Sequence, residues 1–111
     1  EEPAQKDYSF KWNWLAKDLS ITGKILNAVK NEKLSFTFGS SFEVTITLKE
    51  SDKRTLLTLT QKYAPGTEHN DFANINCCVC WGFFLTNLKS VLEHCNDLRE
   101  TLVDDESLVN R

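Results

Sequence analysis

The stretch Trp81-Gly-Phe-Phe-Leu-Thr-Asn-Leu-Lys-Ser-Val-Leu-Glu-His-Cys-Asn-Asp-Leu-Arg99 predicts a single helix with one apolar face, near the end of a chain that otherwise reads as strands. At about 100° per residue, the apolar side chains share an arc of roughly 120°. They are Phe84, Leu85, Leu88, Val91, Leu92 and Cys95. Such a stripe must be covered, so we expect the helix to lie across one face of a sheet.

Five segments before this helix alternate apolar and polar residues with the two-residue period of a strand. The first places four aromatic side chains on one face: Tyr8, Phe10, Trp12 and Trp14. The others are expected near 19–25, 34–38, 42–48 and 54–62, with turns at 31–32, 39–41 and 50–53. Short strands separated by turns favour an antiparallel meander. A loop then leads to the helix, with Asn74 or Asn76 as the expected N-cap.

Composition excludes several classes of protein. The chain has 111 residues, 41% of them apolar, which suits one globular domain. A net charge of −3 without a Lys/Arg cluster argues against nucleic-acid binding. The longest uncharged apolar run, 77–85, falls short of the roughly 20 residues that span a bilayer, so no membrane span is expected. No signal peptide is recognised, and we expect a cytoplasmic protein.

The cysteines do not suggest a disulfide framework. Cys77, Cys78 and Cys80 crowd into four residues and cannot pair evenly with Cys95, so reduced thiols are expected. The Cys-x-x-Cys spacing of Cys77 and Cys80 leaves a zinc or redox site as an alternative. A tetrahedral site would also need His69, His94 or Cys95 to converge, so we expect no metal and no cofactor. No nucleophile and base are matched, and no catalytic residue is assigned.

The helix stretch, with the motif Asp97-Leu98-Arg99 after it, resembles the carboxy-terminal signature of the SRPBCC or START-like superfamily. It is most similar to bacterial homologues of the activator of the heat-shock-protein-90 ATPase. Segments 23–25, 33–38, 44–48 and 55–60 resemble the same family in order, so the resemblance covers roughly 8–99. It implies an α+β helix-grip fold, in which a curved antiparallel β-sheet wraps around a long carboxy-terminal α-helix and encloses an apolar cavity.

The resemblance also sets expectations for domain boundaries. The sheet is expected at about 6–63, the connecting loop at 64–76, the helix at about 77–96 and a tail at 97–111. An amino-terminal strand and two short helices of the family are missing from a chain that begins at Glu1, so the single domain is expected to be incomplete, or to pair with another copy as a homodimer. Relatives usually carry glycine where this chain has Cys80 and Cys95. A Cβ makes a left-handed backbone costly, so we expect altered helix ends.

These patterns favour a non-enzymatic domain that binds a small apolar ligand between sheet and helix. The alternative for the same residues is ordinary core packing. A second hypothesis, from the resemblance, is a co-chaperone-like interaction module with a stress-response role; a cyclase or lyase activity of the wider superfamily ranks third. The expected cavity-lining residues are Tyr8, Phe10, Trp12, Trp14, Phe36, Trp81, Phe84, Leu85, Leu88 and Leu92.

Overall fold

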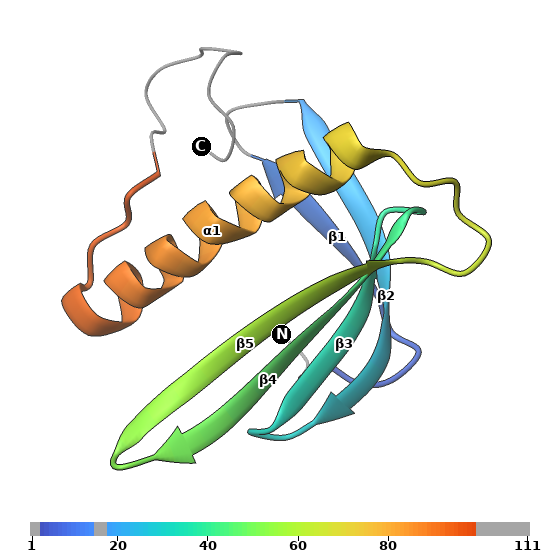
Figure 1. The fold of residues 1–111 in the computed structure, drawn as a ribbon. Coiled ribbons are helices and arrows are strands. Elements are labelled where there is room, and N and C mark those ends of the chain that lie inside the picture. The colour runs from blue at the N-terminus through green and yellow to red at the C-terminus, as the bar shows by residue number, and fades with distance from the viewer. Residues whose placement is uncertain (1–2, 15–17, 100–111) are drawn as a thin grey trace. The chain divides into compact units, whose positions relative to one another are not determined.

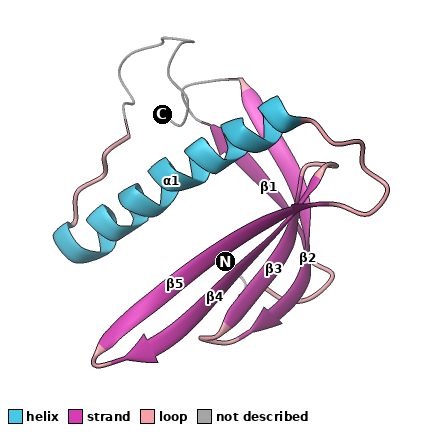
Figure 2. Cartoon of the chain, in the orientation of Figure 1, coloured by secondary structure: helices cyan, strands magenta, loops and turns pink. Residues whose placement is uncertain are grey.

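The computed structural model describes residues 3–14 and 18–99. Within these residues, five strands and one helix follow each other along the chain (Figure 1). They are β1 (Ser9–Trp14), β2 (Leu19–Val29), β3 (Lys33–Phe38), β4 (Phe42–Ser51), β5 (Arg54–Tyr63) and α1 (Asp71–His94). The strands form one sheet in the order β1-β2-β3-β4-β5 (Figure 2). The predicted α+β class is therefore confirmed, with the strand meander and the carboxy-terminal helix of the helix-grip fold.

The sheet has one apolar face, because antiparallel pairing aligns the apolar positions of neighbouring strands. Phe36 of β3 lies opposite Val44 of β4. Leu34 lies opposite Ile46 of β4, which in turn lies opposite Leu59 of β5. The best-buried apolar side chains of the sheet are all on this face: Ile25, Phe36, Phe42 and Val44. The other face carries Ser and Thr; there the Ser35 and Thr45 hydroxyls share a hydrogen bond of 3.0 Å.

A β-bulge in β2 keeps the alternation in phase. Ile25 pairs with Phe36 but Asn27 pairs with Ser35, so Leu26 is an extra residue in its strand. The shift places Ala28 opposite Leu34 on the apolar face and Asn27 on the polar face. Without it, Asn27 would follow Ile25 onto the apolar face, because side chains two residues apart share a side of the strand.

The β4–β5 hairpin closes with two residues rather than the four expected. Ser51 still pairs with Arg54, so only Asp52 and Lys53 lie in the turn. Both have positive φ, 48° and 62°. Positive φ at both central residues is the requirement of a type I′ turn, whose twist matches that of the flanking strands.

The helix begins earlier than predicted. It starts at Asp71, so the connecting loop ends at Asn70, and neither Asn74 nor Asn76 is the cap. Asn70 caps the helix instead: its side-chain oxygen accepts a hydrogen bond of 3.1 Å from the Ala73 backbone N–H. Asp71 in the first turn adds a favourable charge at the positive end of the helix dipole.

The carboxy-terminal end of α1 does turn through a left-handed residue. Cys95 has φ 55° and ψ 30°, and the following N–H of Asn96 turns back to the Ser90 carbonyl at 3.4 Å. The expectation that a cysteine here would change the helix end was therefore wrong. Cys80 lies in the interior of α1, so the helix-end argument does not apply to it.

The chain groups into two compact units. One holds Glu1–Trp12 and Ile21–His69, which includes most of the sheet. The other holds Asn13–Ser20 and Asn70–Arg111, so the end of β1 and the start of β2 belong with the helix. Each unit is considered separately below.

Candidate apolar-ligand site

Two aromatic pairs line up on the apolar face of the sheet. Phe10 of β1 meets Phe36 of β3 edge to face, with ring centroids 5.6 Å apart and planes at 85°. Trp12 repeats the arrangement with Phe38, at 5.9 Å and 83°. T-shaped packing places a positive ring edge on a negative ring face, which is a favourable geometry. Phe36 is buried, while the Phe10 and Trp12 side chains are half-exposed and present apolar surface.

Gly23 of β2 makes the first of these pairs possible. A Cβ at this position would overlap the Phe10 ring and the Thr37 carbonyl oxygen. The ring of a β1 residue therefore occupies the space that a side chain on β2 would need, in contact with the sheet backbone. The two-residue period places Gly23 on a face, but only the strand pairing reveals what covers it.

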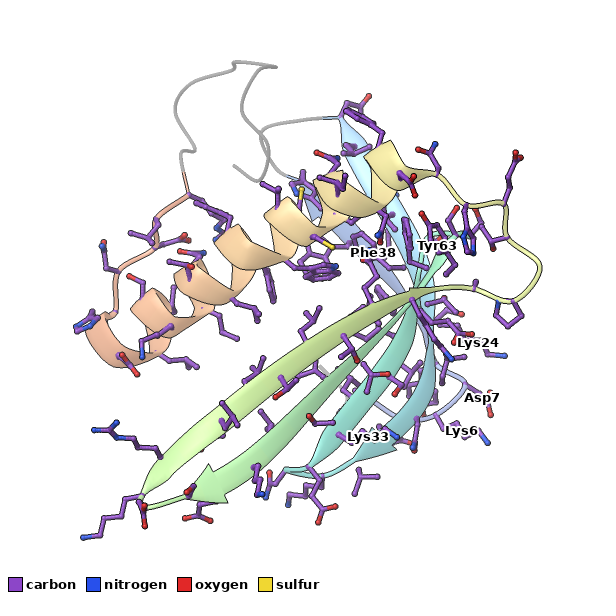
Figure 3. The ribbon with its side chains drawn as sticks, in the orientation of Figure 1. Lys6, Asp7, Lys24, Lys33, Phe38 and Tyr63 are labelled. Carbon is purple, nitrogen blue, oxygen red and sulfur yellow. The ribbon has the colours of Figure 1, made fainter. Side chains whose placement is uncertain are left out.

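The apolar face extends to β4 and β5 through residues that the sequence analysis did not assign to the site. Phe42 packs against Tyr63 at 5.3 Å, and Tyr63 stacks on His69 at 4.1 Å with an 11° tilt. Phe38 and Tyr63 are labelled in Figure 3. These positions align with Phe36 only through the register of β3, β4 and β5, which the sequence does not specify.

One polar side chain interrupts this face. Gln61 lies opposite Val44 in the β4–β5 register, two residues from both Leu59 and Tyr63, and is half-buried. An amide offers both hydrogen-bond donors and an acceptor. The prediction of an almost wholly apolar interior missed this residue, and the out-of-pattern Gln in a Thr- and Leu-rich strand was the available signal.

The two ends of the predicted aromatic stripe are placed differently from its centre. Tyr8 precedes β1, is 43% exposed, and its carbonyl accepts a hydrogen bond of 2.8 Å from the Ile25 N–H. Trp14 is the half-buried last residue of β1 and groups with the helix rather than with Phe10 and Trp12. The structure thus brings Phe10, Trp12 and Phe36 together in one unit.

The helix residues expected to line a cavity separate into two groups. Trp81 is 6% exposed and meets Phe84 edge to face at 5.6 Å, and Leu85 and Leu88 are half-buried. Leu92 is 74% exposed and Val91 40%, and Cys95 is exposed as well. The predicted stripe is therefore covered over its first half only.

Two ion pairs lie beside the strands of the sheet. Lys24 and Asp7 pair at 3.5 Å (Figure 3), and Glu43 pairs with its cross-strand neighbour Lys62 at 3.0 Å. Both pairs include well-exposed side chains, so each contributes little to stability.

A comparison with protein families identifies the fold's relatives. The model of the family described as "Activator of Hsp90 ATPase homolog 1-like protein" matches residues 3–93. The chain belongs to this family. We refer to it below as the activator-like family; the match includes all five strands and nearly all of α1.

Two further comparisons add less. The solution structure of the Bacillus halodurans protein BH1534 is 22% identical, with a TM-score of 0.48 over 63% of this chain and 51% of that one. The chain thus spans about half the length of that protein. No curated protein matches the chain.

Helix α1 is long and apolar enough to cross a membrane by length and composition, although the nine-residue run considered above predicted no span. This criterion alone is weak, because core helices of other domains also meet it. Residues 71–93 of this helix fall within the match to the activator-like family, so we treat α1 as part of that domain.

The motif Asp97-Leu98-Arg99, which follows the helix and carried part of the family resemblance, forms hydrogen bonds with Asn87 of α1. The Asn87 side chain accepts a hydrogen bond of 2.7 Å from the Leu98 N–H and donates one of 3.1 Å to Asp97. Asp97 also accepts hydrogen bonds from the Arg99 backbone and from its guanidinium, at 2.5–3.0 Å. These contacts with Arg99, and then Asn87, lower the pKa of Asp97. These contacts tie the segment after α1, which lies beyond the residues matched by the family model, back onto the helix.

The four cysteines are free thiols, and one of them has a shifted pKa. All four are unpaired; Cys77 and Cys80 are half-buried, and Cys78 and Cys95 are exposed. Partial burial, and then the neighbouring Cys80 and Cys78, raise the pKa of the Cys77 thiol, whereas a redox nucleophile needs a lowered one. Residues 3–14 and 18–99 contain no group of three or more His, Cys, Asp or Glu side chains placed to hold a metal.

Proposed function

We propose that the chain binds a small apolar ligand on the aromatic face of its sheet, without catalysing a reaction. The observation that carries this proposal is the pair of T-shaped contacts, Phe10 on Phe36 and Trp12 on Phe38, which hold half-exposed rings in fixed positions. Rigid aromatic surface with few polar groups is typical of sites for apolar small molecules. Membership of a START-like family supports the same class of function.

Gln61 is a polar side chain on this otherwise apolar face and lies close to where such a ligand would bind. Because it lies on the apolar face between Leu59 and Tyr63, its amide could bind a carbonyl or hydroxyl of an otherwise apolar molecule. Trp81, Phe84, Leu85 and Leu88 of α1 stay predicted lining residues, and the proposed ligand binding does not depend on them. The exposure of Tyr8 and Leu92 makes these two the weakest members of the predicted set.

The test uses the three tryptophans as reporters, because all belong to the predicted set. Oleate would be titrated into the protein while tryptophan emission and the melting temperature are followed. We expect saturable quenching and a raised melting temperature. Phe10→Ala should weaken binding at least about tenfold, since a Phe side chain contributes roughly 1.5–3 kcal/mol on burial.

A matched control lies on the other face of the sheet. Thr58, opposite Thr47, is exposed, and Thr58→Ala should leave the oleate affinity unchanged. Native mass spectrometry of protein purified from cells, which would detect a retained lipid-sized adduct, provides an independent readout. A flat titration with oleate and with a panel of sterols and aromatic compounds, together with no adduct, would refute apolar ligand binding.

The second candidate is an interaction with a chaperone, and the name of the matching family favours it. Under this hypothesis the protein raises the ATPase rate of a heat-shock-protein-90 chaperone in a cytoplasmic setting. Mixing the two proteins and measuring phosphate release tests it directly. An unchanged rate over a tenfold excess of this chain would reject the co-chaperone role while leaving ligand binding open.

A further inference from the structure

Helix α1 has a second apolar stripe that is separate from the proposed ligand site. Phe72, Ile75 and Val79 are 82%, 62% and 63% exposed. At about 100° per residue, Phe72 points away from Trp81, nine positions later, by half a turn. The stripe therefore lies on the side of the helix opposite its most buried residue.

The spacing of this stripe is that of a helix–helix seam. Positions 72, 75, 79, 82 and 86 alternate steps of three and four residues, the repeat that keeps a seam facing a partner helix. They hold Phe, Ile, Val, Gly and Thr, so the bulky residues are concentrated toward the amino-terminal half and the small ones toward the carboxy-terminal half. Such an arrangement is complementary to itself when two copies run antiparallel.

Gly82 has no explanation within the described residues. It lies in the interior of α1, where glycine weakens a helix, and a Cβ there would meet no heavy atom within 4 Å. A glycine on a helix surface allows close approach of another backbone or of a large side chain. Gly82 lies on the seam, one turn after Val79, and leaves space in which a bulky side chain of another molecule can pack.

We propose that this face of α1 binds the same face of a second copy of the chain, as an antiparallel helix pair. In the register that seats Val79 of each copy on Gly82 of the other, Ile75 meets Thr86, and Phe72 meets the aliphatic stem of Lys89. The ends also match in charge. Asp71 of one copy then lies beside Lys89 of the other, and both side chains are exposed.

The charge match selects the antiparallel orientation. In a parallel pair, Asp71 would face Asp71 and Lys89 would face Lys89, with like charges opposed. Lys89 already contacts Glu93 of its own helix at 3.1 Å, and its remaining ammonium donors can reach a second carboxylate. A single helix pair is a small interface, so a weak dimer with a dissociation constant in roughly the micromolar range is expected.

Sedimentation velocity of the full chain, over a concentration series and with reducing agent to keep Cys78 unpaired, tests the dimer. Val79→Lys should raise the dimer dissociation constant at least about 100-fold, because it removes two buried Val side chains and introduces two charges. Leu56→Lys is the matched control: Leu56 is 61% exposed, close to Val79 at 63%, but lies on β5. It should leave the dimer intact.

Two further variants keep the proposal falsifiable. Gly82→Leu fills the space in which Val79 of the second copy would pack, and leucine also favours the helix. It should therefore abolish the dimer while the helical circular dichroism signal stays unchanged or increases. Asp71→Lys and Lys89→Glu should each weaken the dimer by roughly fivefold, and the double variant should restore it. A parent chain that stays monomeric at every concentration, or equal effects of Val79→Lys and Leu56→Lys, would overturn the proposal. Absence of rescue in the double variant would overturn the antiparallel register.

Discussion

Replacing Cys95 with glycine should stabilise the protein, because the helix ends through a left-handed residue that has a side chain. At φ 55° and ψ 30°, the Cβ of Cys95 is close to the following carbonyl oxygen. This conformation costs an L-residue roughly 1–2 kcal/mol, whereas glycine adopts it freely. Glycine also loses more backbone entropy on folding, which offsets roughly 0.5–1 kcal/mol. At the middle of each range, the net gain expected for Cys95→Gly is about 0.75 kcal/mol.

Urea unfolding followed by circular dichroism at the helix wavelength measures this gain, and a melting temperature raised by about 2–8 °C is the thermal counterpart. Two controls isolate the backbone effect. Cys95→Ala keeps a Cβ, so its stability should stay within about 0.5 kcal/mol of the parent. Cys78→Gly removes an exposed cysteine from the helix interior and should destabilise by up to about 1 kcal/mol.

The ordering of these variants decides the outcome. The left-handed cap is supported if the free energy of unfolding of Cys95→Gly exceeds that of the parent, while that of Cys95→Ala stays close to it and that of Cys78→Gly is lower. If Cys95→Ala stabilises as much as Cys95→Gly, the gain comes from removing a thiol. A Cys95→Gly variant no more stable than the parent would refute the argument that the left-handed backbone is strained here.

Four further changes have defined outcomes. Gly23→Ala should destabilise by about 1–3 kcal/mol in urea unfolding, since its Cβ would overlap the Thr37 carbonyl oxygen; a neutral effect would contradict that packing. Asn70→Ala should cost about 1 kcal/mol in the same assay through loss of the cap, and no loss would mean that the helix start is held otherwise. Lys53→Gly should add about 0.5–1 kcal/mol, because its φ of 62° suits glycine; lower stability would argue against the type I′ turn. In an NMR titration, the Asp97 carboxyl should ionise below its ordinary pKa of 3.8, so its stabilising contribution is present above that pH and is lost as the pH falls; Arg99→Ala should return the pKa toward 3.8, and an unchanged value would exclude Arg99 as the main cause.

The five strands could be predicted because a strand with one buried face shows apolar and polar residues in strict alternation. Phe10 and Trp12 alternate with Lys11 and Asn13, and this is also their burial pattern in β1. The bulge at Leu26 could not be predicted, since it is defined by the pairing of β2 with β3. The same limit hid Phe42 and Tyr63 from the site, because only register brings them into line with Phe38; Phe38 itself follows Phe36 on one strand and could have been assigned by alternation.

The start of the helix was missed for a different reason. The cap Asn70 lies in a polar stretch with two competing asparagines, Asn74 and Asn76, and the exposed apolar residues of this stretch, Phe72 and Ile75, lie on the face away from Trp81. The single-face pattern of the helix therefore becomes clear only at the residues that share the Trp81 face. Two apolar stripes on one helix blur its single-face pattern, and the exposed stripe then reads as part of a loop.

The residues at the end of α1 that carried the sequence resemblance are distinct from those proposed to bind a ligand. The side chains of Asn87, Asp97 and Arg99 form hydrogen bonds with one another and with the Leu98 backbone, at the end of α1. These hydrogen bonds fix the conformation of the segment that follows α1. They place no requirement on a ligand. Under the proposed ligand binding, specificity would come from the sheet, where the apolar face combines the fixed rings of Phe10 and Trp12 with the amide of Gln61. Substitutions of Asn87, Asp97 or Arg99 should therefore lower stability without changing which ligand is preferred, whereas substitution of Gln61 should change the preference among apolar ligands that differ by one polar group.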